Sequence, residues 1–290
     1  MLEQQLLNGM ILGSLYALLS VGFSLIVGIL KMITFAHGDV FMAGAFSGLV
    51  ALLVFPHSFL AALAGAVAGA AILGAITEWA AFRPFRSGPE MAPALVTIGF
   101  SIVLQALVLL VAGADTKPFP FELDFGRWTV SGITVSGLEL ATIGTALAVL
   151  AGLGLAIAGT RWGLALRATA AHYQAAQIMG INTDRVVLAA FVLGSGLAGL
   201  GGLLFGAYYG AFYPLMGVVI SMKALAAATL GGIGNVGGAI IGAYLLGIIE
   251  NLVAGYLSAN YRDVIAFAIL ILVLLIRPAG ILGRGEEEKV

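Results

Sequence analysis

The 290-residue chain is strongly apolar, since 61% of its residues are hydrophobic, 9% are charged and the mean hydropathy is +1.10. Soluble domains carry roughly a quarter charged residues, so this composition excludes a protein whose surface faces water on all sides. The 13 basic and 14 acidic residues nearly balance and fall mostly between apolar runs, which excludes a basic surface for nucleic acid. Cysteine is absent, so disulfides, thiolate metal sites and cysteine nucleophiles are excluded as well.

Apolar runs recur along the whole chain, and each is long enough to cross the hydrocarbon of a bilayer as a helix. We predict an all-α, polytopic membrane bundle of about eight or nine helices, forming one domain over residues 1–290. The first run lacks the basic start and cleavage site of a signal peptide, so we expect it to be retained. The predicted spans are 8–30, 40–55, 59–80, 93–112, 139–158, 187–207, 236–255 and 262–276, with a Gly-rich crossing near 214–232.

The basic residues predict the orientation, because Lys and Arg are retained preferentially on the cytoplasmic side of a membrane. One side of the predicted spans holds Lys31, Arg83, Arg86, Arg161, Arg167, Arg185, Arg277, Arg284 and Lys289, and the other holds Lys117, Arg127 and Arg262. We therefore predict a multi-pass protein of the bacterial inner membrane with a periplasmic amino terminus and a cytoplasmic carboxyl terminus. This requires an odd number of crossings, so the segment from Met216 to Gly232 should traverse the membrane, as a broken helix.

Many of the 41 glycines recur four residues apart, which places small residues on one helix face. Such faces let helices approach closely in lipid. The pairs are Gly9/Gly13, Gly44/Gly48, Gly65/Gly69, Gly206/Gly210 and Gly238/Gly242. We interpret them as packing surfaces of a tight bundle and not as binding sites.

Two hydrophilic stretches lie between the spans. In the predicted outer stretch, residues 113–139, Ser131 and Gly132 separate two short alternating runs, which predicts a β-hairpin that either contacts a soluble partner or is an ordinary structured loop. In the predicted inner stretch, residues 160–186, small and apolar residues recur at helical spacing from Leu166 to Met179. We expect a short amphipathic helix there that needs a partner, with Gly180 as its stop and Asn182, Thr183 or Asp184 capping the next helix.

Inserting a charged side chain at the centre of a membrane helix costs about 2.5–3.5 kcal/mol on insertion scales. Each polar or charged residue inside an apolar span therefore needs a structural or functional explanation. The set consists of His37, Asp39, Glu78, Gln105, Lys223, Glu250 and Asn251. We interpret Glu78, and Glu250 with Asn251, as interfacial or capping groups near the ends of their spans. Lys223 lies closer to the membrane centre, must find a carbonyl, a carboxylate or water, and is a candidate for lining a pathway.

The stretch from Ile33 to Phe46 has no turn-forming loop around His37 and Asp39, which predicts a backbone break inside the protein. These two residues lie two apart and would not share a helix face, so a catalytic His/Asp pair is poorly supported. A metal site also fails, because no third ligand is evident. The predicted pathway residues are Thr34, His37, Gly38, Asp39, Lys223, Gly232 and Gly234.

Nucleotide-binding motifs are not supported. Gly232, Gly234 and Gly237 spell G-x-G-x-x-G, but no β-branched strand precedes them and an apolar helix follows. The phosphate-binding pattern G-x-x-x-x-G-K-[ST] does not occur in the chain. We therefore expect this chain to bind neither a dinucleotide nor ATP.

Four segments together resemble the LivH-type permeases of branched-chain amino acid ABC importers, over essentially the whole chain. They are residues 8–46, 167–186, 230–250 and 274–284. The most specific features are the FAHG stretch followed by M-x-G-A, and the A-x-x-x-G-I-N pattern that begins at Ala176.

The resemblance implies a heterodimer with a related permease, two cytoplasmic ATPases that bind ATP and magnesium, and a periplasmic binding protein that delivers substrate. This chain would then carry no cofactor and would be no enzyme itself. The coupling loop to the ATPase is implied to contain Ala175, Ala176, Met179, Gly180, Ile181 and Asn182. The chain departs from the family in two places. Asp39 stands where the family often has Glu. The few residues directly before Ala176 include no Asp or Glu, although an acidic residue is common there, and this weakens the expectation of a salt bridge to the ATPase.

Other functions remain open at this stage. Leucine, isoleucine or valine is the expected substrate, but permeases for urea and other short amides or amino acids look similar. An ion-coupled secondary transporter would need buried carboxylates as a coupling site, and these are nearly missing. An intramembrane enzyme would need a nucleophile or a metal constellation, and neither is evident in the sequence.

Overall fold

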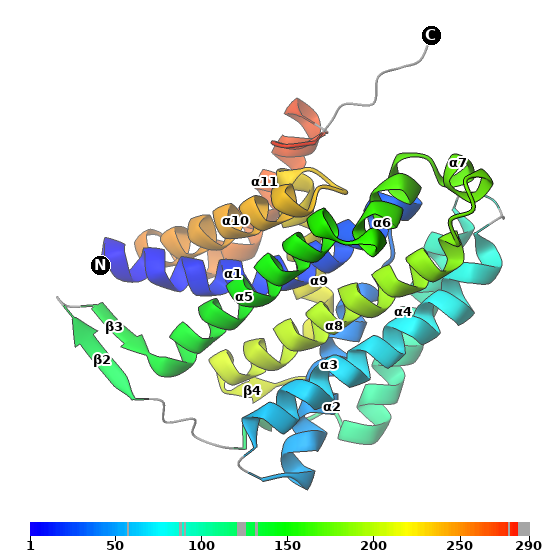
Figure 1. Cartoon of the computed structure of the whole chain (residues 1–290). Coiled ribbons are helices and arrows are strands. Elements are labelled where there is room, and N and C mark those ends of the chain that lie inside the picture. Colours follow the sequence, from blue (N-terminus) through cyan, green and yellow to red (C-terminus); the bar gives the residue numbers. More distant parts are fainter. Residues whose placement is uncertain are drawn as a thin grey trace.

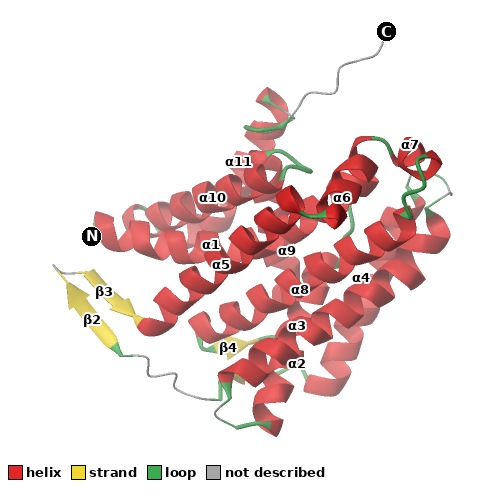
Figure 2. Ribbon diagram, viewed as in Figure 1, coloured by secondary structure: helices red, strands yellow, loops and turns green. Residues whose placement is uncertain are grey.

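The computed structural model describes residues 1–56, 58–86, 89, 91–120, 126–130, 133–277 and 279–283. Within this part of the chain, eight helices are long and apolar enough to cross a membrane, as predicted. They form a bundle with two small two-stranded sheets (Figures 1 and 2). The long helices are α1 (Leu2–Leu30), α2 (His37–Val54), α3 (Phe59–Ile76), α4 (Ala92–Ala112), α5 (Gly137–Gly159), α8 (Thr183–Tyr209), α10 (Val236–Tyr256) and α11 (Arg262–Ile276).

Three short helical turns extend these elements. A π-helical turn, η1 (Thr77–Phe82), and a 3-10 turn, η2 (Arg83–Phe85), continue α3, and the 3-10 turn η3 (Ala259–Tyr261) precedes α11. Single π-helical turns within longer helices occur frequently at functional sites, which makes the end of α3 a region of interest.

A ninth apolar helix, α9 (Met216–Gly231), occupies the segment predicted to complete the crossings. Its 16 residues span about 24 Å at 1.5 Å per residue. The prediction of a broken helix is wrong, because α9 is continuous and the irregular backbone lies at its ends, where φ is 69° at Leu215 and 113° at Gly232. Strand β4 (Ala211–Phe212) precedes α9 at one end of the bundle, and the backbone of Gly234 approaches Gly28, near the far end of α1.

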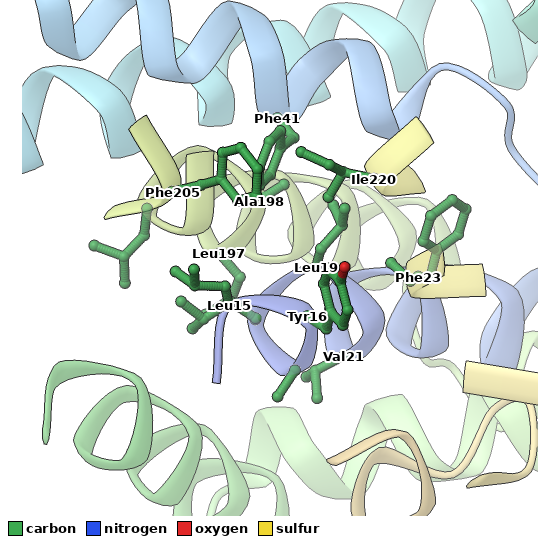
Figure 3. Close-up of a cluster of buried hydrophobic side chains, with 14 of the residues drawn as sticks. Leu15, Tyr16, Leu19, Val21, Phe23, Phe41, Leu197, Ala198, Phe205 and Ile220 are labelled. Carbon is green, nitrogen blue, oxygen red and sulfur yellow. The ribbon is translucent and has the colours of Figure 1, made fainter. Parts of the chain in front are cut away.

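Helix α1 lies at the centre of the bundle, where it contacts α8, α9 and α10. It is apolar all round and almost entirely buried from Gly9 onward, as expected for a helix surrounded by others. Figure 3 shows Leu15 and Leu19 of α1 among side chains from three other helices. These neighbours include Phe41 from α2, Leu197 and Phe205 from α8, and Ile220 from α9.

The glycine pairs mediate close packing between helices, and this interpretation is confirmed for four of the five pairs. At Gly13 an added Cβ would lie 2.8 Å from the Cα of Tyr244 in α10. At Gly44 it would lie 2.6 Å from the Cα of Gly199 in α8. The fifth pair differs, because Gly210 has nothing within 4 Å and ends α8 with a φ of 72°.

The predicted hairpin is also confirmed. Strand β2 (Arg127–Val130) pairs antiparallel with β3 (Ile133–Ser136), while the two expected turn residues lie outside the described part of the chain. The Gln4 side chain of α1 accepts a 2.9 Å hydrogen bond from the Thr134 amide and donates one of 3.1 Å to its carbonyl. The hairpin therefore lies where α1 begins, at the end of the bundle opposite α6 (Arg161–Ala171) and α7 (Tyr173–Ile178) (Figure 1).

The glycine contacts predict a difference between two matched substitutions. Gly44→Ala should lower the stability of the protein by about 1–3 kcal/mol, because the new methyl group would overlap α8. Gly99→Ala in α4 should be neutral or slightly stabilising, since nothing lies within 4 Å of the added atom. Thermal unfolding of both variants in detergent measures this difference, and equal melting temperatures would contradict the packing role.

Candidate functional site

The connection between α1 and α2 is the first candidate pathway element, and it passes from the exposed Lys31 to buried positions at Thr34 and Ala36. Helix α1 ends at Lys31 with a φ of 56°, and α2 begins at His37. The side chains of Thr34 and His37 are only 1% and 2% exposed. The His37 ring packs against Phe23, with 4.7 Å between ring centroids, so α2 starts well inside the bundle. The predicted break in the protein interior is confirmed.

His37 and Asp39 do not interact, as their spacing predicts. The carboxylate of Asp39 accepts hydrogen bonds from Ser101 and, at 3.1 Å, from Gln105, both on α4. The His37 side chain is hydrogen-bonded to the backbone of Leu19, and its Nε2 has no hydrogen-bond partner among the described residues. The pair therefore does not form an acid–base unit.

The start of α2 packs directly on α9. A Cβ added to Gly38 would lie 2.6 Å from the Oγ of Ser221. A Cβ added to Gly217 would overlap the backbone of Gly38, so the two glycines let these helices pack closely. The predicted pathway residues Gly38 and Lys223 thus lie on neighbouring helices. Gly232 and Gly234 are at the other end of α9, where Gly232 packs on Gly283.

Lys223 is the centre of a buried ionic cluster. Its Nζ lies 3.1 Å from Oε2 of Glu250 and 2.7 Å from Oδ1 of Asp263. The Tyr16 hydroxyl donates a 3.0 Å hydrogen bond to the same Glu250 oxygen, and Lys223 Nζ lies 5.9 Å from the Tyr16 ring centroid. Glu250 is 0% exposed and lies inside α10, so its interpretation as a capping group is wrong and it is a buried ion-pair partner of Lys223. A lysine inside an apolar span needs a carboxylate partner, and this requirement of Lys223 could have identified the role of Glu250 from the sequence.

A second ionic network links three elements at the opposite end of the bundle. The Arg86 guanidinium lies 2.5 Å from the Glu78 carboxylate in η1 and 2.8 Å from Asp184 at the start of α8. It also donates a 3.0 Å hydrogen bond to the Tyr173 hydroxyl in α7. Arg83 binds the other oxygen of Asp184 at 2.9 Å. Glu78 is therefore a buried ion-pair partner, and the bridging role of Arg86 was missed by sequence reasoning.

The amphipathic segment consists of two helices instead of one. The predicted helix from Leu166 to Met179 is interrupted at His172, whose backbone is extended and whose Nδ1 accepts a hydrogen bond from the Ala175 amide. The helices on either side are α6 and α7. Two other predictions are confirmed: Gly180 leaves the helix with a φ of 83°, and Asn182 caps α8 by accepting a 3.1 Å hydrogen bond from the Arg185 amide.

The four-residue spacing of Ala176 and Gly180 predicts that both lie on one outward helix face, and the exposed surface of α7 differs from this prediction. Ala176 is 4% exposed and faces its own chain, so it does not share an outward face with Gly180. The outward side chains are those of Ile178 and Met179, which are 86% and 80% exposed. Ala175 and Gly180 are exposed beside them.

A cavity of about 1070 Å³ opens between the hairpin and the beginning of α1. Its lining is rich in polar side chains, namely Gln4, Asn8, Arg127, Thr134, Ser136, Glu139, Tyr208 and Tyr209. Within the described ranges no three His, Cys, Asp or Glu side chains are placed to hold a metal ion.

A polytopic helical bundle with an irregular buried connection and paired intramembrane charges has the architecture of a membrane permease. Residues 5–274 match the family "branched-chain amino acid transport system / permease component", and the chain belongs to this family. It is a multi-pass inner-membrane protein and the non-catalytic membrane component of a transport system.

Two full-length relatives are similar to the chain. The high-affinity branched-chain amino acid transport system permease protein LivH of Salmonella typhimurium is 42% identical over 302 residues, which cover 99% of this chain and 97% of the relative. The corresponding protein BraD of Pseudomonas aeruginosa is 38% identical over 299 residues, with the same coverage. The resemblance found in the sequence is confirmed.

A more distant relative and one solved structure are also similar to the chain. The autoinducer 2 import system permease protein LsrC of Yersinia enterocolitica is 33% identical over 193 residues, covering 63% of this chain and 52% of the relative. The structure of PsaBC from Streptococcus pneumoniae in complex with Fab has a TM-score of 0.51 at 13% identity. The structural alignment covers 96% of this chain and 92% of the matched chain in that structure.

The Lys223 cluster predicts a non-additive pair of substitutions. Lys223→Met should lower stability by about 3–5 kcal/mol, because it leaves the Glu250 charge buried without a cation. Lys223→Met combined with Glu250→Gln should recover much of this loss. Chemical unfolding in detergent measures the effect, with Lys117→Met as the control for losing a lysine outside the cluster. A double variant no more stable than the single one would contradict the pairing.

Proposed function

We propose that this chain is the channel-forming permease subunit of an ATP-driven importer that moves leucine, isoleucine or valine across the inner membrane. The observation that carries the proposal is the similarity to LivH and BraD over 99% of the chain. Permeases for urea or other short amides remain the alternative within this class, and the comparisons do not favour it.

The alternative that the chain is an ion-coupled secondary transporter is supported less well than an ATP-driven importer. Such a carrier needs a buried carboxylate that exchanges its ion during transport. Here Asp39, Glu78 and Glu250 each bind a donor or a cation within the chain. These pairings support a subunit whose energy comes from elsewhere.

The energy and the substrate would be supplied by partner proteins. We infer two cytoplasmic ATPase subunits that bind ATP and magnesium, a homologous second permease that completes a heterodimer, and a periplasmic binding protein. No cofactor is assigned to this chain, because its sequence lacks a phosphate-binding loop.

We infer that the amino terminus is periplasmic and the carboxyl terminus cytoplasmic, in accord with the bias of basic residues. The hairpin and the large polar cavity would then face the periplasm, and α6 and α7 the cytoplasm. Reporter fusions after Gly126 should read as periplasmic and those after Ala170 as cytoplasmic. The opposite pattern would invert the assignment.

The proposed translocation pathway runs past the break between α1 and α2. Thr34 lies in this break, His37, Gly38 and Asp39 form the buried first turn of α2, and Lys223 lies on the neighbouring helix α9. Gly232 and Gly234 would belong to its cytoplasmic end. Non-helical backbone at membrane depth is tolerated only where protein or a water-filled cavity surrounds it, which supports this assignment.

The proposed coupling loop to the ATPase is the segment around α7, with Ala175, Met179, Gly180, Ile181 and Asn182 as in the sequence-based prediction. The exposed apolar side chain of Ile178 would belong to the same surface, and the buried Ala176 would support the loop from the inner side. Arg86 joins Tyr173 of α7 to η1 and α8, so a push on α7 would reach the membrane helices through this side chain.

The coupling role predicts that Met179→Asp weakens ATPase binding by about tenfold, because a charge replaces an exposed apolar anchor at the centre of the loop. Gln174→Glu, on the same helix, should have little effect, since it adds the same charge at an exposed polar position. Pull-down of the ATPases by the purified permease measures both variants. Unchanged binding by Met179→Asp would exclude α7 as the docking element.

The substrate is tested by ATP hydrolysis of the assembled importer in nanodiscs. Binding protein loaded with leucine should raise the hydrolysis rate, because in the proposed function leucine is the substrate that the binding protein delivers to the permease. Binding protein offered urea should leave the rate at its basal value. Stimulation by urea and not by leucine would assign the chain to the alternative substrate class.

A further inference from the structure

The Lys223 cluster is buried at one side and open at the other. The side chains of Glu250 and Lys223 are 1% and 8% exposed, whereas that of Asp263 is 57% exposed. Asp263 lies in the first turn of α11. A solute that approaches this end of the bundle can thus reach the ion pair between Lys223 and Asp263 from its exposed side.

We propose that Lys223 and Asp263 form an entry site for the zwitterionic backbone of an amino acid. The ligand carboxylate binds Lys223 and the ligand ammonium binds Asp263. This inference rests on the proposed function and specifies which part of the substrate this chain recognises.

The argument begins with charge balance. Lys223 is shared between two carboxylates, so a ligand carboxylate can replace Asp263 at the 2.7 Å contact while Glu250 keeps Lys223 paired. The ligand ammonium then pairs with the released Asp263. Because every charge has a partner before and after the exchange, the ligand avoids the large cost of a desolvated unpaired charge. A molecule with only one of the two charges would leave a charge unpaired.

Glu250 provides a second, independent indication of a ligand. One of its oxygens binds Lys223 and Tyr16, while Oε1 is buried without a hydrogen-bond partner among the described residues. A buried carboxylate oxygen without a donor is unfavourable. It provides a free acceptor for one N–H of the ligand ammonium, whose other N–H groups remain available to Asp263.

The surroundings fit a small amino acid. Val219 lies one turn before Lys223 on the same face of α9 and is 45% exposed. It supplies an apolar surface for a branched side chain.

The absence of cysteine in the chain permits a direct test with single cysteines. Val219→Cys and Val218→Cys are matched variants, because the two valines are 45% and 40% exposed but only Val219 shares the Lys223 face. Each variant is assembled with its partners in nanodiscs and treated with a water-soluble thiol reagent. Saturating leucine should slow modification of Val219→Cys by about tenfold and leave Val218→Cys unchanged.

Ligand analogues and second-site variants identify the charges. 4-Methylpentanoate lacks the ammonium and 3-methylbutylamine lacks the carboxylate, so neither should protect Val219→Cys. Protection by leucine should be lost with Asp263→Asn and kept with Asp263→Glu. Asp115→Asn, which removes an exposed acid at a loop outside the cluster, should also keep it. Asp263→Asn leaves the Lys223–Glu250 pair intact, and co-elution with the partners verifies its fold.

Three results would overturn the proposal: no reaction of Val219→Cys with the reagent, equal protection of both cysteines, or protection by either singly charged analogue. Uptake of labelled leucine by the unmodified importer is measured in parallel. Uptake without protection refutes the entry site alone, whereas absence of uptake refutes the proposed function.

Discussion

Hydrocarbon offers no hydrogen-bond partner, so the protein itself must satisfy each polar group at membrane depth, and this constraint organises the structure. Helix α1 can occupy the centre because its surface is apolar and its glycines let α10 approach closely. Most of the charges that remain inside are paired, Lys223 with Glu250 and Arg86 with Glu78, while the buried Asp39 accepts hydrogen bonds from two side chains of α4. Packing and pairing together allow an irregular connection such as the one before His37 to persist among the helices.

The two ionic groups suggest how a permease divides its tasks. The Lys223 cluster includes the exposed carboxylate of Asp263, which suits contact with a charged solute. The Arg86 network lies at the opposite end and joins α7 to α3 and α8. In the proposed mechanism, the first group would meet the substrate and the second would receive mechanical input from the ATPase.

The helices and most of their ends could be predicted from the sequence, because spans of apolar residues and caps such as Gly180 and Asn182 are local signals. The tertiary partners could not. Glu250 lies 27 residues from Lys223 along the chain, and only packing brings the two together. The inward position of Ala176 escaped prediction for a similar reason, since an isolated amphipathic pattern does not reveal that His172 breaks the helix and turns α7.

The central claim is that this chain transports branched-chain amino acids as part of an ATP-driven assembly. Its most direct test is uptake of labelled leucine by proteoliposomes that contain the permease pair, both ATPases and external binding protein. We predict accumulation when ATP is enclosed and no ion gradient is present, and none without ATP or without binding protein. Accumulation by this chain alone, driven by a proton or sodium gradient, would contradict the account.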